Sequence, residues 1–170
     1  FTSQQSLFGT YITAHRGSSM SAPENTIAAI ETAIEDYSDY AEIDVQETKD
    51  GVVVLLHDDR LNRTTNGSGY LWNTTYMEIL QLDAGSWFSK DYDNVGVPTL
   101  EEVLEISKGR IKLNIEIKIN SRNPTLVEKV VQMVNDFDFE QQCVITSTNY
   151  AALAKVKELN SNIKTGYIMP

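Results

Sequence analysis

The stretch YAEIDVQETKDGVVVLLHD, residues 40–58, indicates the fold of this chain. Apolar and acidic residues alternate in its first half, so an extended strand places Glu42 and Asp44 on one face and the following isoleucine and valine on the other. A hairpin signal at residues 49–51 and an apolar run at 52–56 come next. We therefore expect a strand at 40–46 followed by a short antiparallel arm.

Strand and helix signals alternate through most of the remaining sequence. Short apolar runs predict strands at 11–14, 111–120, 143–146 and 165–169. Helical spacing of apolar residues predicts helices that begin at Asn25 or Thr26, Thr99, Asn123-Pro124 and Asn149. Repeated strand–helix–strand order indicates a parallel sheet with helices outside it. Polar residues at the carboxyl ends of the strands favour a TIM-type barrel over an open sheet.

The length of the chain limits how much of a barrel it can build. A TIM barrel needs eight strands and typically ~250 residues, whereas this chain has 170 residues. We therefore predict one catalytic domain over residues 1–170, an α/β fold comprising the N-terminal two-thirds of a TIM-type barrel. Residues 58–98 are polar and turn-rich, with one short helix. We interpret them as an insertion after the second-strand hairpin.

Composition excludes several classes of protein. The formal net charge of −10 argues against a nucleic-acid-binding surface, so an anionic substrate would need a local positive field. No apolar run approaches the ~20 residues of a membrane helix. Cys143 is the only cysteine and lies in an apolar run, which predicts a buried, unreactive thiol.

Acidic residues on two of the expected strands indicate a cation site. Glu42 and Asp44 share a face, and alternation in the strand 111–120 places Glu116 on its polar face, opposite the isoleucines. Carboxylates held close together repel each other unless a cation lies between them. Three oxygen ligands without a soft ligand suit Mg²⁺ or Ca²⁺. The simpler interpretation of either strand alone is an amphipathic strand with one wet face.

The two histidines of the chain, His15 and His57, fall at predicted strand ends near these acids. Histidine titrates near neutrality and can transfer protons at working pH. A two-residue turn at Lys49-Asp50 would place His57 opposite Glu42. A structural role is the alternative for each histidine.

Arg16 and Lys118 lie beside these acidic and imidazole groups in the sequence. With a divalent ion present, the two cations would leave the pocket able to hold a phosphodiester anion. The alternative for each is a solvated charge or a surface ion pair.

Together these pieces resemble the glycerophosphodiester phosphodiesterase family. Order and spacing match over residues 12–118, and more loosely to 170. The pieces that carry the resemblance are HRG at 15–17, PENT at 23–26, EIDV at 42–45, TKDG at 48–51, HD at 57–58, RT at 63–64 and EIK at 116–118.

The resemblance implies a TIM-type barrel and metal-dependent hydrolysis of glycerophosphodiesters to glycerol 3-phosphate and an alcohol. The family's Trp-Thr and Thr-Asp motifs of the last barrel strands have no counterpart here. The resemblance implies three kinds of site residue: the metal ligands Glu42, Asp44 and Glu116, the acid/base histidines His15 and His57, and the phosphate-binding cations Arg16 and Lys118.

Other interpretations share the same residues. A sphingomyelinase-D-like phospholipase would show an apolar rim, for which Trp72, Trp87 and Phe88 are available. A metal-binding domain without turnover is another alternative. An enzyme that binds a phosphorylated metabolite would favour a late Gly-rich loop, and none is visible.

We expect a small-molecule glycerophosphodiester as the binding partner and no nucleic acid. An incomplete barrel would expose strand edges and favour self-association. Acceptor patterns for N-glycosylation at residues 62–64, 66–68 and 73–75, and a likeness to soluble domains of membrane-anchored bacterial proteins, favour an extracytoplasmic or membrane-anchored parent protein.

Overall fold

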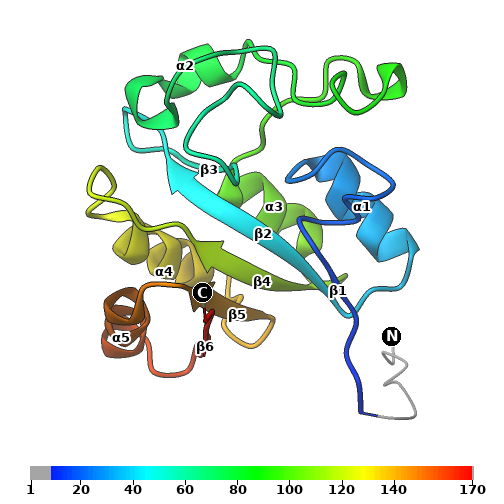
Figure 1. The fold of residues 1–170 in the computed structure, drawn as a ribbon. Coiled ribbons are helices and arrows are strands. Elements are labelled where there is room, and N and C mark those ends of the chain that lie inside the picture. Colours follow the sequence, from blue (N-terminus) through cyan, green and yellow to red (C-terminus); the bar gives the residue numbers. More distant parts are fainter. Residues whose placement is uncertain (1–8, 170) are drawn as a thin grey trace.

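The structure, a computed structural model, describes residues 9–169 (Figure 1). Its sheet has the strand order β1-β2-β4-β5-β6, in which all neighbours are parallel, and β3 pairs antiparallel with β2. The strands are β1 (Thr13–Ala14), β2 (Tyr40–Glu47), β3 (Val53–Leu55), β4 (Lys112–Ile117), β5 (Cys143–Ser147) and β6 (Lys164–Tyr167). The α-helices are α1 (Ile27–Glu35), α2 (Tyr76–Ile79), α3 (Leu100–Ser107), α4 (Leu126–Asp136) and α5 (Tyr150–Leu159), and short 3₁₀ turns are η1 (Leu71–Asn73) and η2 (Lys90–Tyr92).

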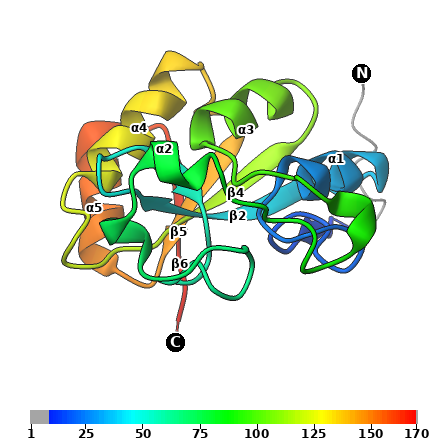
Figure 2. The same ribbon diagram turned by 90° about the horizontal axis from the view of Figure 1, so that it is seen from above.

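Helices α1, α3, α4 and α5 all pack on one face of the sheet (Figure 2). Ile43 of β2 and Ile115 of β4 point into this core, where they meet residues such as Val103 of α3 and Val130 of α4. A doubly wound sheet would carry helices on both faces, whereas a TIM barrel carries them only outside. The one-sided cover therefore matches the predicted barrel type, although in the described residues β1 and β6 form open edges.

The hairpin between β2 and β3 differs from its predicted form by one residue. The pairs Val45↔Leu55 and Glu47↔Val53 imply a three-residue loop over 49–51, not a two-residue turn. Gly51 has φ +80°, the left-handed conformation that closes such a loop with a bulge. Continuing this register places His57 opposite Ile43, so the prediction that His57 lies opposite Glu42 was wrong by one residue.

The excursion, residues 58–98, builds a second and smaller core. It contains η1, α2 and η2, and its buried residues include Leu61, Leu71 and Ile79. Strand β3 joins the two cores, because Val53 and Leu55 face the main core while Val54 faces the second. That this excursion is an insertion relative to a simple barrel stays a prediction.

Most expected elements form where the sequence predicted them. Thr26 and Thr99 cap α1 and α3 through their side chains. The expected cap at Asn123 was wrong: α4 begins after Thr125, and Asn123 instead bonds the backbone of Asn120 and Lys118 in the preceding loop. Strand β4 ends correspondingly early, at Ile117.

Two expectations from composition, on Cys143 and on membrane-spanning helices, can be compared with the structure. Cys143 is 4% exposed, so the prediction of a buried cysteine is confirmed, and burial raises the pKa of its thiol to about 12. Over residues 9–169 no helix combines the length and apolar character needed to cross a bilayer.

Candidate active site

The loop after β1 delivers His15 and Arg16 to the end of β2. Arg16 and Gly17 have φ +55° and +73°, and a Cβ on Gly17 would lie 2.6 Å from Cβ of Ala29. Only glycine allows this contact with α1 at low cost. The Gly17 N–H donates to the Glu42 carbonyl (3.0 Å), and the Arg16 N–H donates to the Glu42 carboxylate (2.8 Å). The loop is thereby anchored directly to a predicted metal ligand.

Three carboxylates converge where the middle of β2 lies beside the carboxyl end of β4. Asp44 lies directly across from Glu116 in the parallel register, and one oxygen from each of Glu42, Asp44 and Glu116 falls within 4.8 Å of the others. Burial, together with the Asp44 and Glu116 charges, raises the pKa of Glu42 to about 7. A divalent cation among the three oxygens would relieve this repulsion, so the donor set fits a hard metal ion.

Two basic side chains border the carboxylates. Nζ of Lys118 lies 3.1 Å from Asp44 and 2.8 Å from Glu116. Partial burial disfavours the Lys118 ammonium, but these carboxylates outweigh it and raise its pKa. Nε of Arg16 lies 3.7 Å from Asp44 and is buried, with no hydrogen-bond partner among the described residues.

Asn25 fixes the carboxylate of Asp44. Its amide nitrogen donates to Asp44 Oδ2 (2.9 Å), and its amide oxygen accepts from the Asp44 backbone N–H (3.0 Å). Asn25 is 4% exposed and has φ +55°, a conformation that asparagine tolerates better than most residues. The polar pair orients one predicted metal ligand before any ion binds.

His57 follows β3, and hydrogen bonds to the backbone of its segment hold it in place. The buried Gln46 side chain donates to the carbonyls of Leu56 (2.8 Å), His57 (3.2 Å) and Asp58 (2.9 Å). Nδ1 of His57 lies 2.9 Å from Asp58 Oδ1. The imidazole lines an open cleft of about 490 Å³ together with Asp58, Asp59, Glu116, Lys118, Ile119, Asn120 and Thr148.

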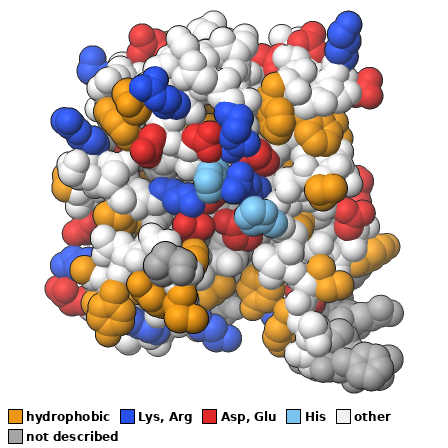
Figure 3. Space-filling model, viewed as in Figure 1, with side chains coloured by type: hydrophobic (Ala, Val, Ile, Leu, Met, Phe, Trp, Pro, Cys, Tyr) orange, Lys and Arg blue, Asp and Glu red, His pale blue; other side chains and the backbone are white. Residues whose placement is uncertain are grey.

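His15 lies on the other side of the carboxylates from this cleft-lining segment. Its Nε2 is 3.8 Å from Glu42 Oε2, and its side chain is 70% exposed. Figure 3 shows the imidazoles at the surface, surrounded by acidic and basic side chains. Both histidines therefore reach the solvent-facing side of the carboxylate group, where a substrate could approach.

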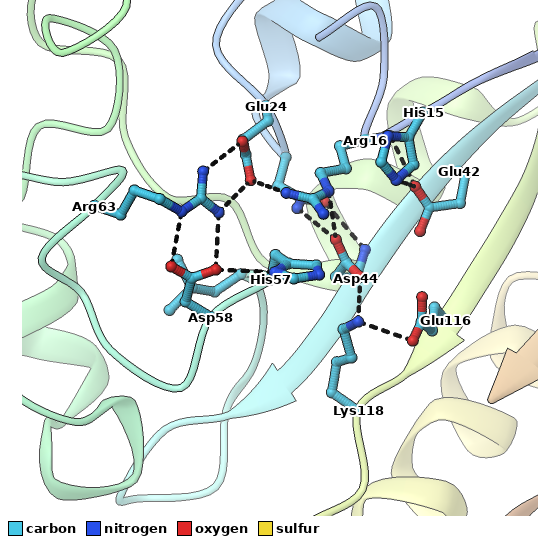
Figure 4. A network of polar contacts seen from close by, with 12 residues as sticks. His15, Arg16, Glu24, Glu42, Asp44, His57, Asp58, Arg63, Glu116 and Lys118 are labelled. Carbon is cyan, nitrogen blue, oxygen red and sulfur yellow. Dashed lines mark hydrogen bonds and ion pairs between the residues drawn. The ribbon is translucent and has the colours of Figure 1, made fainter. Parts of the chain in front are cut away.

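All residues predicted from the sequence as site residues meet in one region (Figure 4). These are His15, Arg16, Glu42, Asp44, His57, Glu116 and Lys118. Sequence reasoning assigned no role to five others that hold them: Glu24, Asn25, Gln46, Asp58 and Arg63. Four of these belong to the motif pieces that carry the family resemblance. Gln46 could have been found by alternation, because it shares a strand face with Glu42 and Asp44.

Comparison with known proteins identifies the family of the chain. Residues 15–169 match the family model described as the glycerophosphoryl diester phosphodiesterase family. YhdW of Bacillus subtilis (strain 168) is 42% identical over 158 residues, covering 93% of this chain and 65% of YhdW. The glycerophosphodiester phosphodiesterase of Caldanaerobacter subterraneus subsp. tengcongensis is 40% identical over 161 residues, covering 94% of this chain and 66% of that protein. The chain thus spans about two thirds of the length of these relatives.

Solved structures give the same result. An Oleispira antarctica phosphodiesterase in complex with the product sn-glycerol-3-phosphate has a TM-score of 0.82 and 37% identity, covering 93% of this chain and 65% of that one. The predicted α/β class is confirmed, with a TIM-type arrangement of strands and helices whose barrel is not closed within the described residues. By sequence and by structure, the chain belongs to the glycerophosphoryl diester phosphodiesterase family.

Proposed function

We propose that the protein to which this chain belongs hydrolyses glycerophosphodiesters to glycerol 3-phosphate and an alcohol, with the aid of a divalent cation. The convergence of three carboxylates, two imidazoles and two basic side chains at one end of the sheet carries this proposal. The related Oleispira antarctica phosphodiesterase, named as a complex with sn-glycerol-3-phosphate, supports the substrate class.

Glu42, Asp44 and Glu116 would hold the cation, and their all-oxygen donor set suits Mg²⁺ or Ca²⁺. When bound, such an ion acts as a Lewis acid on the phosphoryl oxygens. A divalent charge offsets two of the three carboxylates and Arg16 offsets the third. Lys118 then leaves the pocket with a positive charge, which allows an anionic phosphodiester to bind despite the acidic surface of the chain.

The basic side chains orient the phosphate. Nε of the Arg16 guanidinium lies 3.7 Å from Asp44, and Lys118 bridges Asp44 and Glu116, so both cations border the carboxylates that would hold the ion. Fixed donors of this kind stabilise the charge on the phosphoryl oxygens in the transition state without reorganising.

The histidines supply proton transfer. Hydrogen bonds from Arg63, opposed by partial burial, keep the pKa of Asp58 well below its usual range, so the Asp58 carboxylate only accepts hydrogen bonds. His57 therefore donates through Nδ1–H and leaves Nε2 for the reaction. One histidine accepts the proton of the attacking hydroxyl, from water or from the glycerol moiety, and the other protonates the leaving alcohol oxygen. Such help typically contributes ~10²–10⁴-fold.

The test measures glycerol 3-phosphate released from glycerophosphocholine by this chain and by the full-length protein. Assays contain Mg²⁺, Ca²⁺ or a chelator. We expect metal-dependent release that falls by at least ~10²-fold in His15→Ala and His57→Ala, while both variants keep the wild-type unfolding midpoint. Full turnover in both histidine variants would refute their role. No release by the full-length protein from several glycerophosphodiesters would refute the substrate class.

The metal site has an independent readout. We expect Mg²⁺ or Ca²⁺ to raise the thermal midpoint, because an ion that binds only the folded state stabilises it by ~2.7 kcal/mol at 100 times its dissociation constant. Glu116→Gln should abolish most of this shift. Equal stabilisation of wild type and Glu116→Gln would place the ion elsewhere.

The same assays separate one alternative, and the comparisons address the other. Metal-dependent stabilisation without hydrolysis, in the full-length protein as well, would mark a binding domain without turnover. Neither the family match nor the named relatives favour the sphingomyelinase-D-like interpretation.

A further inference from the structure

We propose that Arg63 is a positioning residue that bridges Asp58 and Glu24 and thereby orients both the His57 imidazole and the Arg16 guanidinium. The inference rests on the proposed function of these two groups and adds a residue to which the family resemblance assigned no role. It gives the excursion, in which Arg63 lies, a direct part in the geometry of the site.

The bridge consists of four hydrogen bonds of equal length. Arg63 Nε and Nη2 donate to the two oxygens of Asp58, each at 2.8 Å. Arg63 Nη1 and Nη2 donate to the two oxygens of Glu24, again each at 2.8 Å. Arg63 thus binds both carboxylates in the bidentate manner that a planar guanidinium provides. Figure 4 shows Arg63 between Glu24 and Asp58.

Each of the two carboxylates has its second partner in the candidate site. Asp58 Oδ1 lies 2.9 Å from Nδ1 of His57, and Glu24 Oε1 accepts from Nη1 of Arg16 at 2.9 Å. The contacts therefore form a continuous chain from His57 through Arg63 to Arg16. One end of this chain is the predicted acid/base group and the other is the predicted phosphate-binding group.

Arg63 limits the freedom of Asp58 in particular. The Asp58 side chain is 30% exposed and, among described residues, its side-chain partners are His57 and Arg63. Without the guanidinium, the carboxylate could turn toward water, since an exposed single contact holds a side chain weakly. His57 would then lose the acceptor that keeps the proton on Nδ1, and its imidazole would mix both tautomers.

Glu24 orients the Arg16 guanidinium as Asp58 orients the His57 imidazole. Burial alone would raise the pKa of Glu24, but hydrogen bonds from Arg63 and Arg16 outweigh it and lower that pKa, so the carboxylate is ionised. Its side chain is 11% exposed, and that of Arg16 is 19% exposed. The hydrogen bond between them orients the Arg16 guanidinium, whose Nε lies 3.7 Å from Asp44.

The loss of the bridge should affect the site more than the fold. Arg63 and Asp58 are 43% and 30% exposed, so their ion pair contributes little to stability, and the less exposed Glu24 keeps its bond from Arg16. Arg110 offers a matched control, because it also grips a distant carboxylate, Glu31, with two bonds of 2.8 and 2.6 Å and is 45% exposed. Arg63→Met and Arg110→Met therefore each remove a guanidinium that binds carboxylates in a bidentate manner, two carboxylates beside the site for Arg63 and one away from it for Arg110.

The primary measurement is the tautomer of His57 by ¹⁵N NMR of the imidazoles, about two pH units above the ordinary histidine pKa of ~6.5. The chain has only two histidines, so His15 serves as an internal reference. We expect Nδ1–H in wild type and in Arg110→Met, and a tautomer mixture in Arg63→Met. Arg63→Lys should restore the wild-type pattern only in part, because lysine cannot form the double fork. An unchanged His57 pattern in Arg63→Met would overturn the inference.

The second measurement is turnover, normalised to folded protein. A misplaced catalytic group can cost ~10²-fold, so we expect kcat to fall roughly 10- to 100-fold and KM to rise in Arg63→Met but not in Arg110→Met. Wild-type kcat and KM in Arg63→Met would overturn the inference and leave the proposed function intact. Inactivity of the full-length wild type would refute the proposed function, and the NMR result would still decide the inference. If Arg63→Met does not fold, Arg63→Gln is judged by the same criteria.

Discussion

The replacement Gln46→Met tests how the His57 segment is held. Methionine has nearly the length and shape of glutamine but lacks the amide N–H groups. Gln46 is 1% exposed and donates to three consecutive carbonyls. The substitution leaves these carbonyls without their shared donor, in a segment that no other described side chain ties to β2 in this way.

The expected cost follows from the burial of each carbonyl. Leu56 is 3% exposed, so its carbonyl is left unsatisfied at a cost of ~1–3 kcal/mol. His57 and Asp58 are half-buried, and water can replace part of their bonds, at roughly 0.5 kcal/mol each. The free energy of unfolding should therefore fall by roughly 2–4 kcal/mol. For a chain of 170 residues this lowers the thermal midpoint by roughly 5–15 °C.

Urea unfolding followed by circular dichroism measures this difference. Gln132→Met is the control, because Gln132 is exposed and, within residues 9–169, its amide bonds only Asp136 on the same helix. We expect the control to change stability by less than ~0.5 kcal/mol. A Gln46→Met protein within ~0.5 kcal/mol of wild type would show that the three bonds do not hold the segment, contrary to this reasoning.

Two further outcomes concern the loop after β1 and the bridge to the excursion. Gly17→Ala should destabilise the fold by more than ~2 kcal/mol, because Gly17 has a positive φ and an added Cβ would overlap the backbone of α1. Gly96→Ala is the control in the same urea assay and should be near neutral, because an added Cβ there meets nothing within 4 Å. In acid, Arg63→Met should cost less stability at pH 3 than at pH 7. The pKa of Asp58 is lower in the folded state than its unfolded value of ~3.9, so the contribution of its ionised form to the free energy of unfolding is complete above that value and is lost as the pH falls below it. An Arg63→Met protein that loses as much stability at pH 3 as at pH 7 would show that the loss does not come from the Asp58 carboxylate.

Much of the fold was predictable because it depends on local pattern. The isoleucines of β4 alternate with polar residues, and this period-two pattern alone identifies a strand with one apolar face. Thr99 was identified as a cap and Thr26 as one of two candidates with Asn25, since a side-chain oxygen before an apolar helical run has a local hydrogen-bonding reason. The expectations for Asn123 and for the turn at Lys49-Asp50 were wrong, because several local conformations suit those residues and packing selects among them.

Part of the candidate site was also predictable. Glu42 and Asp44 share a strand face by geometry alone, and the parallel pairing of their strand with β4 adds Glu116 directly across from Asp44. His15, His57, Arg16 and Lys118 were candidates from their positions beside these acids at predicted strand ends, and the family resemblance implied the same roles for them. Their functional roles stay predictions that the assays above address.

The amino-acid sequence by itself determined which faces of the strands are polar, where most of the helices begin and which residue types could hold a cation and a phosphate. Only the tertiary structure decided that Arg63, from the excursion, grips Glu24 from the loop before α1, 39 positions away in the chain. A strand face follows from a repeat of two residues, which adjacent positions define. A contact between two loops depends on how the cores beneath them pack, and no local period of the sequence encodes that distance.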